Sequence, residues 1–118
     1  MTAEQSRLRL LDYLAHMVEA AGLVSAYVEG MDKNEFEKDT KTQQAVILNI
    51  LVIGEAATKI CTEYPEFVAA HPEVPWKQMR GMRNRMAHGY FEIDLDIVWD
   101  TVRKSLPALR AQLLDISR

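Results

Sequence analysis

One short segment, residues 76–90 (WKQMRGMRNRMAHGY), holds the side chains best suited to chemistry on a phosphodiester. The guanidinium of Arg83 can bind two phosphate oxygens at once and keeps its charge at any working pH. Five residues later, His88 carries an imidazole, a group that can accept or donate a proton in catalysis. Together, these two groups could hold a phosphate and move a proton beside it.

The same segment concentrates the positive charge of the chain. The 118 residues carry 14 basic and 17 acidic side chains, and this total of −3 argues against a nucleic-acid ligand. Residues 76–90 contain four basic side chains and no acidic one, so the rest of the chain carries −7. The four are Lys77, Arg80, Arg83 and Arg85. The local charge therefore favours an anionic ligand that the total would exclude.

The geometry of a helix over 76–88 leaves three arrangements of the site open. At 100° per residue, Arg83 and His88 lie about 140° apart on a straight helix, so they do not point at one atom. Either the long arginine bends round, the helix ends before His88, or two copies of the chain share a cleft. The polar residues that would add charge or hydrogen bonds beside this pair are Arg80, Asn84 and Arg85. Spacing alone fits both a phosphate site and an ordinary basic surface.

The elements that position this segment should be helices, because apolar residues recur at steps of three and four and no run alternates. The predicted helices cover about residues 4–29, 40–64, 76–88 and 94 onward, and the predicted loops are 31–39 and 65–75. A stripe that should face the core is formed by Met79, Met82 and Met86. We therefore expect a single domain, 1–118, folded as a small all-α, up-and-down bundle of four to five helices.

Individual residues predict where the later helices begin. Asp39 or Thr40 can cap the second helix, and Asp94 can cap the last one. Pro107 should either kink the last helix or start a new one with Ser105 as its cap.

A glycine inside the second helix also needs an explanation. Gly54 costs about 1 kcal/mol relative to alanine in a helix interior. We therefore expect another helix to approach closely at Gly54, for example at a subunit contact. Its neighbour Glu55 could belong to the rim of a cleft, although a solvated or hydrogen-bonded structural role is favoured.

Several other functions find no support in the sequence. A single cysteine, Cys61, excludes an internal disulfide and a multi-cysteine zinc site. Asp12, His16 and Glu19 share one helical face but would need ligands from a second helix, so we expect neither a metal nor a cofactor. The longest apolar run, 45–53, is far shorter than the ~20 residues that span a bilayer, so we expect a cytoplasmic protein with no membrane contact.

Beyond these residues, the chain resembles a known family. The run Arg83-Asn84-Arg85-Met86-Ala87-His88-Gly89-Tyr90 resembles the Arg-(four to six residues)-His signature of the HEPN superfamily, in the Arg…His-x-Tyr form of HepT-like toxins. The flanking segments 45–56, 75–84 and 93–107 are similar to the family's second helix, its lead into the motif and its final helix. The resemblance covers roughly residues 40–110.

This resemblance implies a function and a set of partners. HepT-like proteins are all-helical homodimers whose active sites form where the motif helices of two subunits meet. They are metal-independent RNA endonucleases and act as the toxin of a type II-like toxin–antitoxin pair, so tRNA or mRNA is the expected substrate. The implied partner is an MntA-like nucleotidyltransferase antitoxin, which would silence the toxin by transferring AMP to Tyr90.

The resemblance also implies roles for individual residues. Arg83 and His88 would be catalytic, and RNA binding would be supported by Asn84, Arg80 and Arg85. Without the resemblance, Tyr90 would be read as a packing residue. The alternative function is a catalytically idle HEPN module that partners a nucleotidyltransferase or binds a nucleotide, and a plain helical scaffold is a third class.

Overall fold

The computed structural model describes residues 1–117, except for the side chain of Tyr90. The elements along the chain are α1 (Ala3–Tyr27), α2 (Lys33–Glu37), α3 (Thr40–Glu63), α4 (Pro65–Ala70), α5 (Trp76–His88), η1 (Tyr90–Glu92), α6 (Leu95–Asp100), η2 (Thr101–Ser105) and α7 (Leu106–Ile116). Within residues 1–117 there are no strands, which confirms the predicted all-α bundle.

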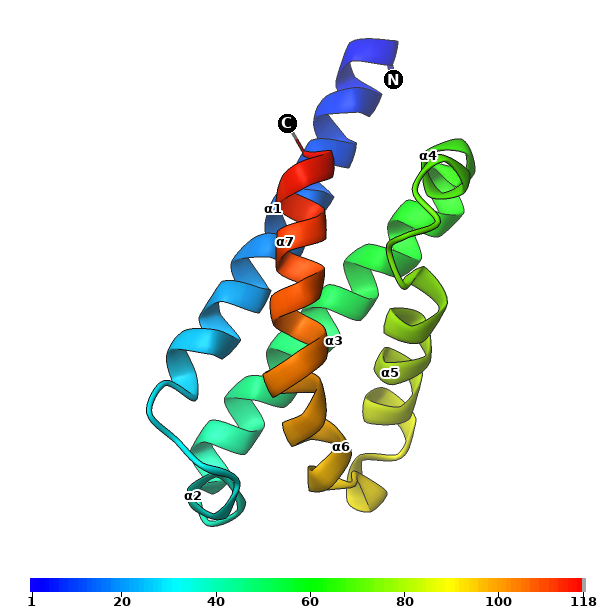
Figure 1. Ribbon diagram of the computed structural model, residues 1–118. Helices are drawn as coiled ribbons and strands as arrows, with labels where there is room; N and C mark the ends of the chain where they lie inside the picture. Colours follow the sequence, from blue (N-terminus) through cyan, green and yellow to red (C-terminus); the bar gives the residue numbers. More distant parts are fainter. Residues whose placement is uncertain (118) are drawn as a thin grey trace.

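α3 is the central helix of the bundle. It packs against α1 on one side and α5 on the other, while α7 packs against α1 (Figure 1). By length and composition α3 is apolar enough to cross a membrane, yet half of its most apolar stretch is buried inside the protein. Burial of this kind is what the core helix of a globular protein shows. α3 therefore supports α5, the helix that carries Arg83 and His88.

A short helix, α2, lies in the segment that the sequence predicts as a loop, so that prediction is wrong. Asp32 and Glu35 form a capping box, in which Asp32 Oδ1 accepts from the Glu35 N–H at 2.8 Å and Glu35 Oε1 accepts from the Asp32 N–H at 3.1 Å. α2 buries Phe36 completely, with its ring centroid 5.1 Å from that of Trp99. One buried aromatic side chain is too weak a periodic signal to predict a helix.

The first half of the second predicted loop is also helical. Pro65 ends α3 and stands in the first turn of α4, where its missing N–H is no disadvantage. Beyond α4 the chain turns into α5, and the indole N–H of Trp76 donates to the carbonyl oxygen of His71 at 3.0 Å. This bond and the burial of Trp76 fix the start of α5, the helix that carries Arg83 and His88.

The predicted caps are confirmed at two helices. Asp39 caps α3, where its Oδ1 accepts from the Thr42 N–H at 3.0 Å and its Oδ2 from the Thr42 hydroxyl at 2.7 Å. These hydrogen bonds hold the pKa of the Asp39 carboxyl below its ordinary value. Asp94 caps α6 by accepting from the Asp96 N–H at 2.8 Å.

The chain stays helical from α6 through η2 into α7, and no described side chain caps the start of α7 before Pro107. Ser105 makes no side-chain capping hydrogen bond, so its predicted role as a cap is wrong. Instead η2 is a stretch of π-helix, in which the N–H of Leu106 donates to the carbonyl oxygen of Thr101, five residues back. The wider turn accommodates the proline, which cannot donate a backbone hydrogen bond.

Candidate functional site

The motif helix α5 runs over Trp76–His88, the range predicted from the sequence, and it approaches α3 most closely at Gly54. A Cβ atom at Gly54 would overlap the Cβ of Arg83 and lie 3.0 Å from the carbonyl oxygen of Met79. The prediction of a close helix approach at Gly54 is confirmed, and the approaching helix belongs to the same chain. The missing side chain lets the base of the Arg83 side chain and the carbonyl group of Met79 lie directly on α3.

The guanidinium of Arg83 is fixed by two neighbours. Its Nε and Nη2 both donate to Glu55 Oε2, at 3.1 and 2.9 Å. Its Nη1 donates to Asn84 Oδ1 at 2.8 Å. The Arg83 side chain is 28% exposed and that of Glu55 is 52% exposed, so the pair is accessible from solvent. The structure therefore joins Arg83 to its neighbour Asn84 and to Glu55 of α3.

Arg83 and His88 line one open hollow of about 380 Å³, which we call the Arg83 hollow. Its lining is formed by Leu51, Val52, Glu55, Arg83, Ala87 and His88. α5 continues through His88, so the alternative in which the helix ends earlier is wrong. Although the two residues are far apart around the helix, one chain places both at the same hollow. The site thus combines a fixed cation with an exposed imidazole.

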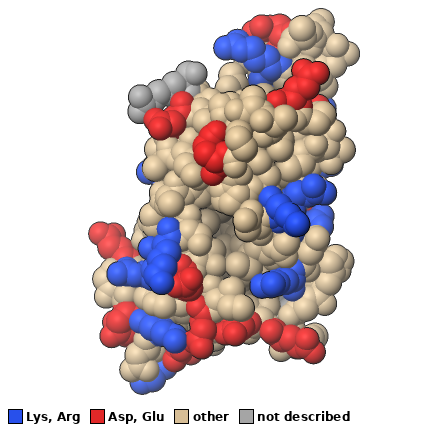
Figure 2. Space-filling model, turned by 45° about the vertical axis from the view of Figure 1, so that its right-hand side comes forward, with Lys and Arg blue, Asp and Glu red and all other residues tan. Residues whose placement is uncertain are grey.

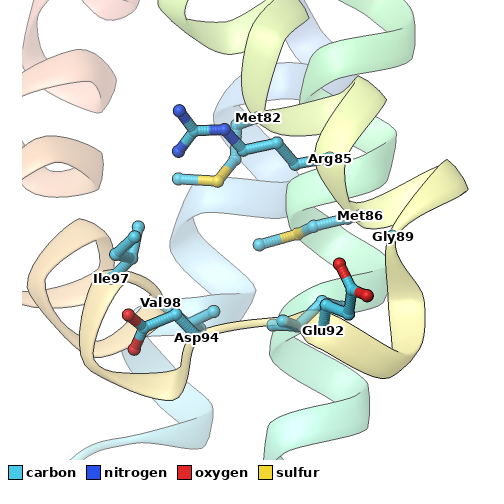
Figure 3. A pocket seen from close by; sticks show the side chains of 9 residues that line it. Met82, Arg85, Met86, Gly89, Glu92, Asp94, Ile97 and Val98 are labelled. Carbon is cyan, nitrogen blue, oxygen red and sulfur yellow. The ribbon is translucent and has the colours of Figure 1, made fainter.

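Arg85 lies on a different side of α5. It lines a second cavity of about 290 Å³, the Met86 cavity, which opens between α5 and α6. In Figure 3, Met82, Arg85 and Met86 point from α5 toward Ile97 and Val98. Two acidic residues, Glu92 and Asp94, also line this cavity. The structure therefore separates Arg85 from Arg83 and His88.

The predicted methionine stripe is buried at two of its three positions. Met79 and Met86 are buried, as expected for a stripe that faces the core, and Met82 is half-buried. Arg80 is exposed on α5. The face on the α5 side carries Lys and Arg side chains on both sides of a hollowed area, and Asp and Glu side chains lie above and below that area (Figure 2). Lys77 and Arg85 line one shallow pocket on α5, whereas Arg83 lines the Arg83 hollow.

Two further predictions concern the Tyr90 side chain and metal binding. Tyr90 begins η1, and its side chain, the predicted site of modification, lies outside the described residues. Among the residues that the structure does describe, no group of three or more His, Cys, Asp or Glu side chains could hold a metal ion.

The sequence is compatible with two roles for Glu55, the rim of a cleft and a hydrogen-bonded structural role. The structure shows both at once, because Glu55 lines the Arg83 hollow and also accepts two hydrogen bonds from Arg83. The signal in the sequence was Gly54, which marks the point where α5 and α3 touch and so identifies the neighbour that can reach Arg83.

The fold and the site define a small all-helical protein with an arginine and a histidine at one hollow near the end of its motif helix. The chain belongs to the HepT-like ribonuclease family, since the family model described as "Ribonuclease HepT-like" matches residues 17–116.

Curated relatives agree with this assignment. The "Probable ribonuclease HepT" of Thermococcus cleftensis is 36% identical over 101 residues, which cover 86% of this chain and 89% of that protein. A protein of Methanocaldococcus jannaschii named "Putative RNase" is 38% identical over 108 residues, covering 91% of this chain and 83% of its own. A "Putative RNase" of Caldanaerobacter subterraneus is 33% identical over 104 residues, covering 88% and 90%. No solved structure gives a significant match.

Proposed function

We propose that this protein is a metal-independent RNA endonuclease whose reaction takes place in the Arg83 hollow. The observation that carries the proposal is that Arg83 and His88 line the same accessible hollow. An arginine suits the charge of a phosphodiester, and a neighbouring imidazole suits proton transfer. Membership of a ribonuclease family supports RNA as the substrate.

The proposed reaction is attack of a ribose 2′-OH on the adjacent phosphorus. The bond from the 2′-oxygen to phosphorus forms and the bond from phosphorus to the 5′-oxygen breaks, which leaves a cyclic 2′,3′-phosphate and a 5′-OH. One proton leaves the 2′-OH and one is delivered to the departing 5′-oxygen. His88 acts as the general base or acid in these transfers. Arg83 binds the phosphate and stabilises the charge that develops on its oxygens.

The remaining polar residues of α5 support RNA binding in this proposal. Asn84 holds one nitrogen of Arg83 and so helps to orient it. Arg80 and Arg85 attract the RNA backbone over a longer range, a contribution that should weaken in high salt.

A second copy of the chain is proposed to complete the site. The outer side of α3 beside the hollow exposes apolar side chains, with Leu48 60% and Val52 38% exposed. Covering them with the same face of a partner would bring two Arg83 hollows together. Sedimentation should then show a dimer for the wild type and a monomer for Leu48→Asp. Leu8→Asp is the control, because Leu8 is exposed to a similar degree on α1 and should leave the dimer intact.

We also propose the cellular role that the family resemblance implies. The protein acts as an RNase toxin on tRNA or mRNA, and its antitoxin is an MntA-like nucleotidyltransferase that transfers AMP to Tyr90. Tyr90 follows His88 by two residues, so an added phosphate and adenine would sit close to the motif. Mass spectrometry after incubation with such an enzyme and ATP should show the adduct on Tyr90, and an unmodified Tyr90 would count against this role.

The enzymatic proposal is tested by analysing the ends of cleaved RNA. The purified protein, in the presence of a metal chelator, should produce 2′,3′-cyclic phosphate and 5′-OH ends. A substrate with a single 2′-deoxy residue at the cleaved position should bind and remain intact. Binding without any cleavage of RNA would instead identify the idle HEPN module. Cleavage of the deoxy substrate would exclude the proposed chemistry.

A further inference from the structure

The hydrogen bonds of Arg83 leave part of its guanidinium available. A guanidinium has five N–H groups in a planar fork. Glu55 accepts from one on Nε and one on Nη2, and Asn84 accepts from one on Nη1. One N–H therefore remains on each of the two terminal nitrogens. Such a pair can bind two oxygens of one phosphate.

The two ends of the Arg83 side chain are held independently. At its base, the Cβ packs on Gly54, where no other residue type would leave room for it. At its tip, Glu55 accepts through a single oxygen, Oε2, which fixes the edge of the guanidinium formed by Nε and Nη2. A long and flexible side chain is thus kept in one orientation beside the Arg83 hollow.

Stability alone does not account for a carboxylate in this position. Ion pairs between partly exposed side chains contribute little to folding, because water screens them. A negative charge beside a phosphate site also opposes binding of the anion. Glu63 of the same helix pairs with Arg9 at 3.7 Å, away from the hollow, and offers a comparison in which no substrate group is involved.

We propose that Glu55 is a positioning residue, which orients Arg83 so that its two remaining N–H groups meet the phosphate of the RNA. The inference rests on the proposed nuclease function. Glu55 works against binding of the substrate through its charge and in favour of the reaction through the geometry it imposes on Arg83.

Two substitutions separate these effects. Because both hydrogen bonds go to one oxygen, the amide oxygen of Glu55→Gln can accept both, while the negative charge is lost. We expect Glu55→Gln to keep kcat within about threefold of the wild type and to lower KM. Glu55→Ala removes the acceptor as well, and the misplaced guanidinium should lower kcat by roughly 10- to 100-fold. Glu63→Gln and Glu63→Ala remove the same groups elsewhere on α3 and should change neither constant.

A measurement on the RNA-free protein shows whether the contact itself exists. The ¹⁵N-bound proton of Arg83 Nε should give a resolved, slowly exchanging NMR signal in the wild type and in Glu55→Gln, and should lose that protection in Glu55→Ala. Thermal unfolding of each variant checks that Glu55→Ala still folds, as expected for an exposed helical position.

The outcomes distinguish the two proposals. If the wild type cleaves no RNA, the nuclease function fails, whatever the NMR signal shows. If the wild type cleaves and Glu55→Ala has an unchanged kcat, the nuclease function stands and the positioning role is overturned. A folded Glu55→Gln that is as slow as Glu55→Ala would also overturn it, because the negative charge and not the geometry would then be required.

Discussion

The two sides of α5 each carry an arginine beside a hollow, and they differ in what surrounds it. On the side of α3, Arg83 is held by Glu55 and Asn84 and shares its hollow with His88. On the side of α6, Arg85 borders a cavity lined largely by apolar side chains, with two acidic residues among them. Both arginines carry the same charge, so charge alone does not distinguish the two sides of α5. A fixed orientation and a neighbouring imidazole distinguish the first side from the second.

The largest expected effect comes from the imidazole on the α3 side. His88→Ala removes the proposed proton-transfer group, which is typically worth ~10²–10⁴ in rate. RNA cleavage should fall by that factor, while binding of a 2′-deoxy oligonucleotide changes little, since His88 is exposed and supports no packing. A cleavage assay with the variant and the wild type at equal concentration measures it. Full activity of His88→Ala would remove the distinction between the two sides.

On the α6 side, the largest effect should be on stability. Met86 is 2% exposed, and truncating a buried methionine to alanine costs about 2–5 kcal/mol. Urea denaturation should show this loss for Met86→Ala, and Met82→Ala, at a half-buried position in the same cavity, should cost less. At temperatures where it stays folded, Met86→Ala should cleave RNA at close to the wild-type rate. A folded but inactive Met86→Ala would show that the two sides are coupled.

Gly54→Ala tests the contact that supports the α3 side. The added Cβ would overlap that of Arg83, so α5 must move, and overpacking of this kind costs about 1–3 kcal/mol. We expect lower stability and slower cleavage together. Gly81→Ala is the matched control, because a Cβ there meets no atom within 4 Å and alanine should stabilise α5 by about 1 kcal/mol. A Gly54→Ala protein as stable and as active as the wild type would contradict the account of this contact.

The smallest effect is expected from a residue that touches neither side of α5. Hydrogen bonds to Thr42 lower the pKa of Asp39 from its ordinary value of 3.8. The pKa of Asp39 is therefore lower in the folded protein than in the unfolded chain. The contribution of the Asp39 carboxylate to stability is present above about pH 4 and is lost as the pH falls through the folded-state pKa. The difference in thermal midpoint between the wild type and Asp39→Asn should therefore shrink on acidification. A difference in thermal midpoint that grows at low pH would contradict the expected direction of the pKa shift. Cleavage of RNA by Asp39→Asn at neutral pH should equal that of the wild type.

Much of the local structure could be predicted from the sequence, because single residues determine it. α5 ends at His88, as the sequence predicts, and Asp39 and Asp94 cap their helices through side-chain oxygens three or fewer residues from their donors. α2 escaped prediction because its five residues bury only Phe36, which gives no periodicity to detect.

The arrangement of the site depended on contacts between distant parts of the chain. Glu55 and Arg83 are 28 residues apart, and only the packing of α5 on α3 brings them together. The same packing decides which arginines of 76–90 share a hollow with His88, which spacing along one helix left open. Gly54 gave a hint of the contact in the sequence but could not name the residue that fills the space.

We propose that the α3 side of α5, and not its positive charge in general, performs the reaction. The most direct test compares cleavage of one RNA by Arg83→Ala and Arg85→Ala, which lose the same charge from the same helix. We expect Arg83→Ala to be roughly 10²–10³-fold slower than the wild type. Arg85→Ala should stay within a few-fold at low salt. Equal losses in the two variants would contradict the account, because charge alone would then explain the activity.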